Sequence, residues 1–287
     1  MRVLLAIDGS EQSYEAARTV GCLTSVSALI VLHVIDLPRL TYPMLGPDIA
    51  KDLAMSVEQA MRIEGERVLK RTMAHLSHQI PSLVKRLESG RPAEVILSIA
   101  QEEAVDLIMA GTRGLGEIKG SVLGSVSRRI LIDSPTPVLI IKAPLPEVRR
   151  ILLPVQGPQD AESTRRFLTK RPFPRQAHVT VFTVVPIPRS ILRMGVTAPE
   201  AKIQQALESA EHFNDSVVAE LSGLPYSFTG LVGMGAPAET ILEQEATTPP
   251  DLILMGTHNP SAVRRLLLGS VSYTVLHQSI SSILVVR

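Results

Sequence analysis

The chain has 287 residues, of which 45% are hydrophobic and 20% are charged, so its composition is that of a globular protein and excludes global disorder. Its 29 Lys and Arg residues against 28 Asp and Glu residues leave a net charge of +1, which excludes a long field of one sign for nucleic acid or an anionic membrane. No apolar run suits a signal peptide or a membrane span and the single cysteine, Cys22, cannot form an intrachain disulfide, so we expect a cytoplasmic protein.

Short apolar segments alternate with helical segments along the first half of the chain. In order, the sequence predicts a strand at 3–7, a helix at 11–21, a strand at 28–34, a helix at 48–78, a strand at 83–87, a helix at 93–103, a strand at 107–110, a helix at 125–133 and a strand at 138–141. With only 3% aromatic residues the core must be aliphatic, which suits buried parallel strands. This alternation predicts an α/β fold with a doubly wound parallel sheet.

The second half of the chain repeats the first. Residues 89–114 (SGRPAEVILSIAQEEAVDLIMAGTRG) align without gaps with residues 234–259 (MGAPAETILEQEATTPPDLILMGTHN), and the same spacing relates 124–127 to 269–272. The opening strand also recurs at 151–155. A repeat of this length indicates two copies of a domain, which we place at 1–143 and 149–287 with a short proline-containing connector between them.

A glycine pattern, G-x2-G-x9-G-S, follows the fourth strand of the first copy at Gly111, Gly114, Gly124 and Ser125. The last glycine and the serine open a helix, whose unpaired amides and positive dipole end suit an anion. The pattern is neither the P-loop nor the dinucleotide fingerprint. Taken singly, such glycines are often only turn residues and Gly-Ser only a helix cap. Together, at the ends of parallel strands, they favour a ligand site.

At this point the sequence resembles the universal stress protein family over both halves. The resemblance rests on VLLAIDGS at 3–10, LHVID at 32–36 and the glycine pattern at 111–127, the last of which matches the ATP-binding variant of the family. It implies two tandem doubly wound five-stranded parallel-sheet domains of a Rossmann-like, adenine-nucleotide-binding type. Their expected strand order is 3-2-1-4-5.

The resemblance also implies which residues bind ATP. Asp8 would face the nucleotide through Mg or Mn, Ala6 would line the adenine pocket, and the backbone of Val34 would meet the adenine. The complete expected set is Ala6, Asp8, Val34, Ala110, Gly111, Arg113, Gly114, Gly124, Ser125, Val126 and Ser127. Three of these residues have alternative interpretations: Asp8 as the start of an Asx turn, Val34 as simply a strand end, and Arg113 as a solvated loop cation.

The second copy departs from the pattern. Gln156 stands where the first copy has Asp8, so a carboxylate for the metal is lost at that position, and Asn259 replaces Gly114. The matching residues that remain are Val184, Gly256, Gly269, Ser270, Val271 and Ser272. Two hypotheses stay open for this copy, a second nucleotide site or a degenerate folding and docking partner.

Three classes of function follow for the chain. The intact first motif favours an ATP-binding stress regulator or sensor, and the eroded second motif favours a nucleotide-free scaffold or chaperone-like module. An ATP hydrolase is disfavoured, because no general base is evident from spacing. Family members pair through their last strands, here 136–141 and 281–286, so we expect an intramolecular pseudo-dimer. A homodimer of chains and a regulatory protein partner of unknown identity are further expectations.

Overall fold

The computed structural model describes residues 1–37, 47–76, 80–112, 123–187, 200–256 and 269–287. The elements of the first domain are β1 (Arg2–Ile7), α1 (Glu11–Thr19), a 3-10 turn (Val20–Cys22), β2 (Ala28–Ile35), α2 (Pro47–Met73), β3 (Ser82–Ser89), α3 (Pro92–Glu102), β4 (Leu107–Gly111), α4 (Ser125–Asp133) and β5 (Val138–Ile141). The second domain has β6 (Arg150–Val155), α5 (Pro158–Leu168), β7 (His178–Pro186), α7 (Glu200–Leu221), β8 (Ser227–Gly235), α8 (Pro237–Thr247), β9 (Leu252–Gly256), α9 (Ser270–Gln278) and β10 (Ser282–Val286).

One helix is shorter than the sequence predicts. The helix expected at 48–78 ends at Met73, because the next amides, of Ala74 and His75, bond three residues back, to Arg71 and Thr72. Bonds of this kind tighten and close the last turn of a helix. The buried Thr72 hydroxyl contributes by donating to the carbonyl of Val68 at 2.9 Å.

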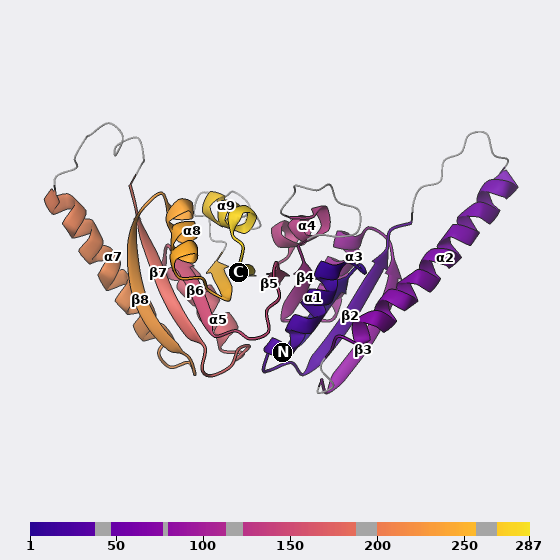
Figure 1. The fold of residues 1–287 in the computed structure, drawn as a ribbon, viewed down its shortest axis with the longest axis horizontal. Helices are drawn as coiled ribbons and strands as arrows, with labels where there is room; N and C mark the ends of the chain where they lie inside the picture. Colours follow the sequence, from indigo (N-terminus) through magenta and orange to yellow (C-terminus); the bar gives the residue numbers. More distant parts are fainter. Residues whose placement is uncertain (38–46, 77–79, 113–122, 188–199, 257–268) are drawn as a thin grey trace.

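The strands form one ten-stranded sheet in the order β3-β2-β1-β4-β5-β10-β9-β6-β7-β8. Each domain therefore has the expected order 3-2-1-4-5, and its strands run parallel. The two halves meet where β5 pairs antiparallel with β10, with Leu139 opposite Leu284. In Figure 1 this seam lies at the centre of the molecule, and α2 and α7 lie at the two outer ends of the molecule.

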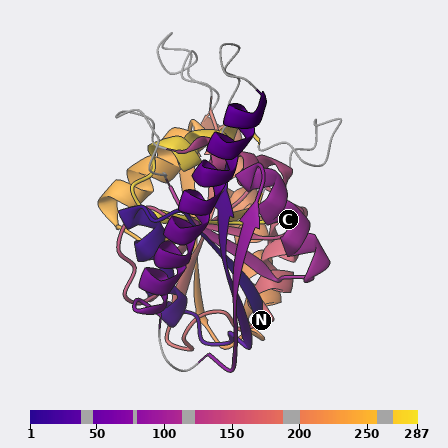
Figure 2. The same cartoon turned by 90° about the vertical axis from the view of Figure 1, so that its right-hand side faces the viewer.

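Helices cover both faces of the sheet because successive strand residues point to opposite sides. Val3, Leu5 and Ile7 face the layer that contains α1 and α2, whereas Leu4 and Ala6 face the layer of α3 and α4. Figure 2, which looks from the side of the first domain, shows α2 lying across the front of the sheet. The layer of α1 and α2 continues into α5 and α7 of the second domain as one apolar cluster.

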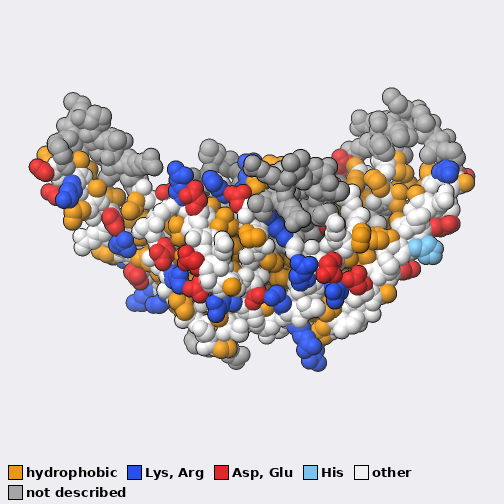
Figure 3. All heavy atoms as spheres, turned by 180° about the vertical axis from the view of Figure 1, so that it is seen from behind, with side chains coloured by type: hydrophobic (Ala, Val, Ile, Leu, Met, Phe, Trp, Pro, Cys, Tyr) orange, Lys and Arg blue, Asp and Glu red, His pale blue; other side chains and the backbone are white. Residues whose placement is uncertain are grey.

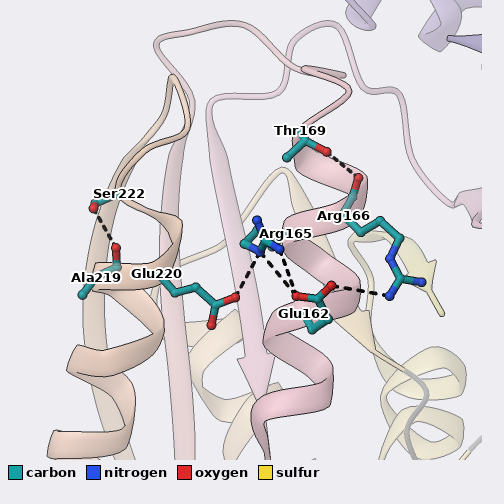
Figure 4. Close-up of polar contacts among 7 residues, drawn as sticks. All are labelled: Glu162, Arg165, Arg166, Thr169, Ala219, Glu220 and Ser222. Carbon is teal, nitrogen blue, oxygen red and sulfur yellow. Dashed lines mark hydrogen bonds and ion pairs between the residues drawn. The ribbon is translucent and has the colours of Figure 1, made fainter.

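The surface carries charges of both signs. On the face shown in Figure 3, basic and acidic side chains are interspersed. Figure 4 shows one such group, in which Arg165 on α5 contacts Glu162 on the same helix and Glu220 on α7 at 3.1 Å. Exposed pairs of this kind add little stability. Within the described residues, every helix is too short or too polar to cross a bilayer.

The connector between the domains is packed into the molecule. Leu145 and Val148 are buried, and the Cys22 thiol donates to the carbonyl of Leu145 at 2.6 Å. Burial raises the pKa of this thiol to about 11, so Cys22 is a structural rather than a reactive cysteine. At the start of the connector, directly after β5, the Lys142 ammonium donates to the carbonyls of Leu276 and Ser279 at 2.6 and 2.7 Å.

We predict that shortening one side chain of the seam is costly. Leu139→Ala removes a side chain that is 1% exposed, and the cavity it leaves should lower the free energy of unfolding by about 2–5 kcal/mol. Urea denaturation followed by circular dichroism measures the change. Leu53→Ala, on the exposed side of α2, is the control and should stay within about 0.5 kcal/mol of the unaltered protein. Equal effects of both changes would contradict the packing described for the seam.

A pH dependence follows from Lys142. Burial lowers the pKa of its ammonium to about 8 from the ordinary 10.5, despite the opposing charge of Glu245. Between these two pH values the unfolded chain binds more protons, so the folded state gains stability as the pH rises. Relative to Lys142→Met, the protein should gain up to about 3 kcal/mol across this window in urea denaturation. A difference between the two proteins that does not change with pH would show that the ammonium is not desolvated.

Candidate nucleotide site

A cavity of about 870 Å³ opens at the carboxyl ends of β1, β2 and β4. Its volume falls in the range of pockets that enclose small ligands and cofactors. It lies where β1 has β2 on one side and β4 on the other, which is the switch point at which ligands bind in doubly wound sheets. The residues around it are Ala6–Gly9, Ser13, Leu32–Asp36, Met61, Glu64, Gly65, Val68, Arg71, Pro92, Ile96, Ala110, Gly111, Gly124–Ser127 and Ile130.

The structure brings the predicted site residues of the first copy to this one cavity. Ala6, Asp8, Val34, Ala110, Gly111, Gly124, Ser125, Val126 and Ser127 all line it, although they come from three strands and one helix. Arg113 and Gly114 lie outside the described residues.

Asp8 is both a turn residue and part of the cavity wall. Its Oδ1 accepts hydrogen bonds from the amide of Ser10 at 3.0 Å and from the hydroxyl of Ser10 at 2.6 Å. The Asx turn that the sequence suggested is therefore present, and Gly9 completes it with a φ of 85°, which favours glycine. Ser10 then caps α1 by accepting from the amide of Ser13. The turn fixes the carboxylate at the mouth of the cavity.

The start of α4 presents backbone amides to the same space. Gly124 is the N-cap in an extended conformation, with no side-chain cap at this end among the described residues, and its own amide donates to the carbonyl of Thr112 at 2.7 Å. The first intrahelical bond runs from Arg128 to Gly124 at 2.8 Å, so the amides of the preceding first turn have no partner within the helix. Amides in this position, at the positive end of a helix, suit a phosphate.

Two of the predicted residues also hold the walls together. The Ser127 hydroxyl donates to the carbonyl of Gly111 at 2.7 Å, which fixes α4 to the end of β4. A Cβ at Gly111 would come within 2.8 Å of the backbone of Gln12, so a glycine is needed here for the close approach of α1. These residues shape the cavity as well as lining it.

Part of the cavity wall comes from α2 and from His33, which the sequence did not indicate. Met61, Glu64, Gly65 and Val68 recur at a helical spacing on α2 and form one wall. This spacing was visible in the sequence, but nothing in it indicates that the helix borders a cavity. His33 on β2 also lines the space, and its Nδ1 lies 2.9 Å from the carbonyl oxygen of Ile7. Because that oxygen can only accept, Nδ1 carries the proton in the neutral ring.

The matching pocket of the second domain is almost closed, with a volume of about 50 Å³. Larger side chains occupy the equivalent wall: Pro154 stands where the first copy has Ala6, and Met255 where it has Ala110. Phe182 pairs with Pro154 as Leu32 pairs with Ala6. Of the predicted residues, Val184, Gly256, Val271 and Ser272 line this pocket, whereas Gly269 and Ser270 begin α9 outside its lining. Asn259 lies outside the described residues.

A carboxylate does reach this second pocket, from a position that the sequence analysis did not consider. Asp160 on α5 is 8% exposed, and its Oδ2 accepts from the amide of Gln156 at 3.0 Å. Its Oδ1 lies so close to Gly256 that a Cβ there would come within 2.2 Å of it. The acidic group thus fastens the start of α5 and takes up space inside the pocket.

Comparison with known proteins gives the same family for both halves. The family model described as "Universal stress protein family" matches residues 1–142 and 147–287. A universal stress protein of Thermus aquaticus is 34% identical over 143 residues, which cover 49% of this chain and 97% of that protein. One from Synechocystis is 23% identical over 304 residues and covers 99% of both chains. The crystal structure of one from Archaeoglobus fulgidus matches with a TM-score of 0.65 at 23% identity, covering 99% of this chain and 97% of that one, and shows the same fold.

We predict that Gly111 contributes to stability whether or not a ligand binds. Gly111→Ala forces the new methyl group against the Gln12 backbone and should lower the free energy of unfolding by about 1–3 kcal/mol, as for other overpacked sites. Gly269→Ala is the control, because a Cβ there meets nothing within 4 Å. Thermal unfolding of the ligand-free proteins measures both changes. A stable Gly111→Ala protein would contradict the close approach of α1.

Proposed function

The chain belongs to the universal stress protein family, with two tandem family domains, and from that premise we propose that it is a stress-response regulator whose first domain binds ATP. The observation that carries the proposal is the cavity of about 870 Å³, into which the start of α4 faces from one side and the ends of β1 and β2 from others. The apolar side chains of Ala6, Leu32 and Val34 suit an adenine ring, and the amides at 125–127 suit phosphates.

A divalent cation fits the same arrangement. Mg²⁺ in nucleotide sites is commonly held by one or two carboxylates together with phosphate oxygens, so the single carboxylate of Asp8 is sufficient on the protein side. We propose that Asp8 contacts Mg or Mn bound to the nucleotide. The ion would neutralise phosphate charge, while the Asx turn keeps the carboxylate in place.

The proposed role is retention of ATP rather than rapid hydrolysis. Among the described residues that line the cavity, only Arg71 carries a permanent positive charge. Efficient phosphoryl transfer needs a clamp of charges on the transferred group and a residue that positions the nucleophile. Slow hydrolysis by a bound water remains compatible with the site.

For the second domain we propose docking without nucleotide. Its pocket of about 50 Å³ is too small for a mononucleotide, and the side chains that close it are well buried. The antiparallel pairing of β5 with β10 supports an intramolecular pseudo-dimer in which this domain covers the edge strand of the first. A cytoplasmic location, a homodimer of chains and a regulatory protein partner belong to the same proposal.

We predict that a bulky residue at Gly124 abolishes ATP binding. The backbone of Gly124, with φ −71° and ψ 160°, is one that valine adopts readily, so Gly124→Val should fold normally. Its side chain would stand at the start of α4, where the phosphates are proposed to lie. Calorimetric titration with ATP and Mg²⁺ should show affinity reduced by about 100-fold or more, as for loss of several charge-assisted hydrogen bonds.

The control for this change exists within the chain. Gly269 caps α9 in almost the same conformation, with φ −62° and ψ 157°, and Gly269→Val should leave the affinity unaltered. If the two variants lose affinity equally, the site is not confined to the first domain. If neither loses affinity, the start of α4 does not bind the phosphates.

A further inference from the structure

Each domain closes the end of a helix that belongs to the other. The residues responsible follow the last strand of each domain: Lys142 follows β5, and Arg287 follows β10. Lys142 donates to the carbonyls of Leu276 and Ser279 at the end of α9. Arg287 donates through Nη2 to the carbonyls of Leu131 and Ile132 in the last turn of α4, the second of them at 3.2 Å. Cations at the C-terminal end of a helix are attracted to the negative end of its dipole and donate hydrogen bonds to its unpaired carbonyls.

The two contacts are symmetric in position but differ in charge balance. The buried carboxylate of Glu245 acts on Lys142, and Glu245 also accepts at Oε1 from the hydroxyl of Ser279 at 2.8 Å. Among the described residues, Arg287 has no buried carboxylate partner of this kind. Its Nη1 is buried and has no hydrogen-bond acceptor in the same part of the chain. The charge of Arg287 is therefore directed mainly at α4 and at Asp133, the last residue of that helix.

The helix that Arg287 closes is the one whose start borders the large cavity. α4 has nine residues and so spans about 13 Å, with Gly124 at one end and the Arg287 contact at the other. Its second half is held by Ile130 and Leu131, whose side chains are fully buried. A short, well-packed helix is the kind of rigid element that can transmit a constraint on its last turn to the amides of its first turn. Figure 1 places α4 and α9 on either side of the seam.

We propose that Arg287 is a positioning residue for the nucleotide site of the first domain, supplied by the second domain. The inference rests on the proposed function of that site. Arg287 holds α4 by its carbonyl end, so that the amides at 125–127 are oriented toward the phosphates before ATP arrives. By linkage, bound ATP must in turn strengthen the Arg287 contact and the association of the two domains. The second domain thus contributes to a site whose lining, in the described part of the chain, comes from the first domain.

The test compares Arg287→Met with Lys142→Met in the full chain at pH 7. Both variants remove one cross-domain helix contact at equivalent positions, so Lys142→Met is the control for any general loosening of the seam. Only Arg287→Met touches α4, and it should weaken ATP binding in calorimetry by about 5-fold or more, whereas Lys142→Met should stay within about 2-fold. Arg287→Lys, which keeps the cation, should recover part of the loss. In the nucleotide-free protein, amide resonances of Ser125–Ser127 should shift in Arg287→Met and not in Lys142→Met.

The outcomes separate this inference from the proposed function. If the unaltered protein binds ATP and Arg287→Met binds it equally well, the positioning role is wrong and the proposed function stands. Equal losses in both variants would mean that a loosened seam, rather than Arg287, weakens binding, and would also overturn the inference. If the unaltered protein binds no ATP, the proposed function fails and the positioning role fails with it.

Discussion

The site depends on the position of β1 between β2 and β4. Parallel strands end at the same edge of a sheet, and at this point the following segments leave toward opposite faces: the chain after β1 enters α1, and the chain after β4 leads to α4. The divergence leaves a space that the sheet itself does not fill. Because the divergence is a property of strand order, both domains possess it, and the order alone does not decide which of them holds a ligand.

The size of the side chains around this space differs between the two domains and determines how much of it stays open. The same strand order surrounds about 870 Å³ in the first domain and about 50 Å³ in the second. Two small residues in the first, Ala6 and Ala110, correspond to Pro154 and Met255 in the second. On α7 the side chain of Asn214 is buried and donates to the carbonyls of Val181 and Leu231, so this helix is fastened to the sheet, whereas α2 borders the open cavity. A filled pocket gains packing and loses the capacity to bind.

The sequence predicted the elements and the site walls unequally. The strands, the repeat and the glycine pattern after β4 were predictable from apolar runs and spacing, because these mark strand ends directly. The strand order and the site roles of Ala6, Asp8 and Val34 followed instead from the resemblance to the family. The wall formed by α2 was not, since an amphipathic spacing such as that of Met61, Glu64 and Val68 does not say what the helix faces. Nor was the role of Asp160 predictable. Gln156 occupies the position equivalent to Asp8, and the carboxylate comes instead from Asp160 in the first turn of α5. The cross-domain contacts of Lys142 and Arg287 depend on the seam geometry and have no signature in local sequence.

The molecule is asymmetric: two domains of one fold form a continuous sheet, but the pocket at the switch point is about 870 Å³ in the first domain and about 50 Å³ in the second. The most direct test is the number of ATP molecules bound per chain, measured by equilibrium dialysis of the full chain with labelled ATP and Mg²⁺ at saturating concentration. One ATP per chain is the predicted result. Two would show that the small pocket of the second domain opens for nucleotide, and none would contradict the assignment of the first domain's cavity to ATP.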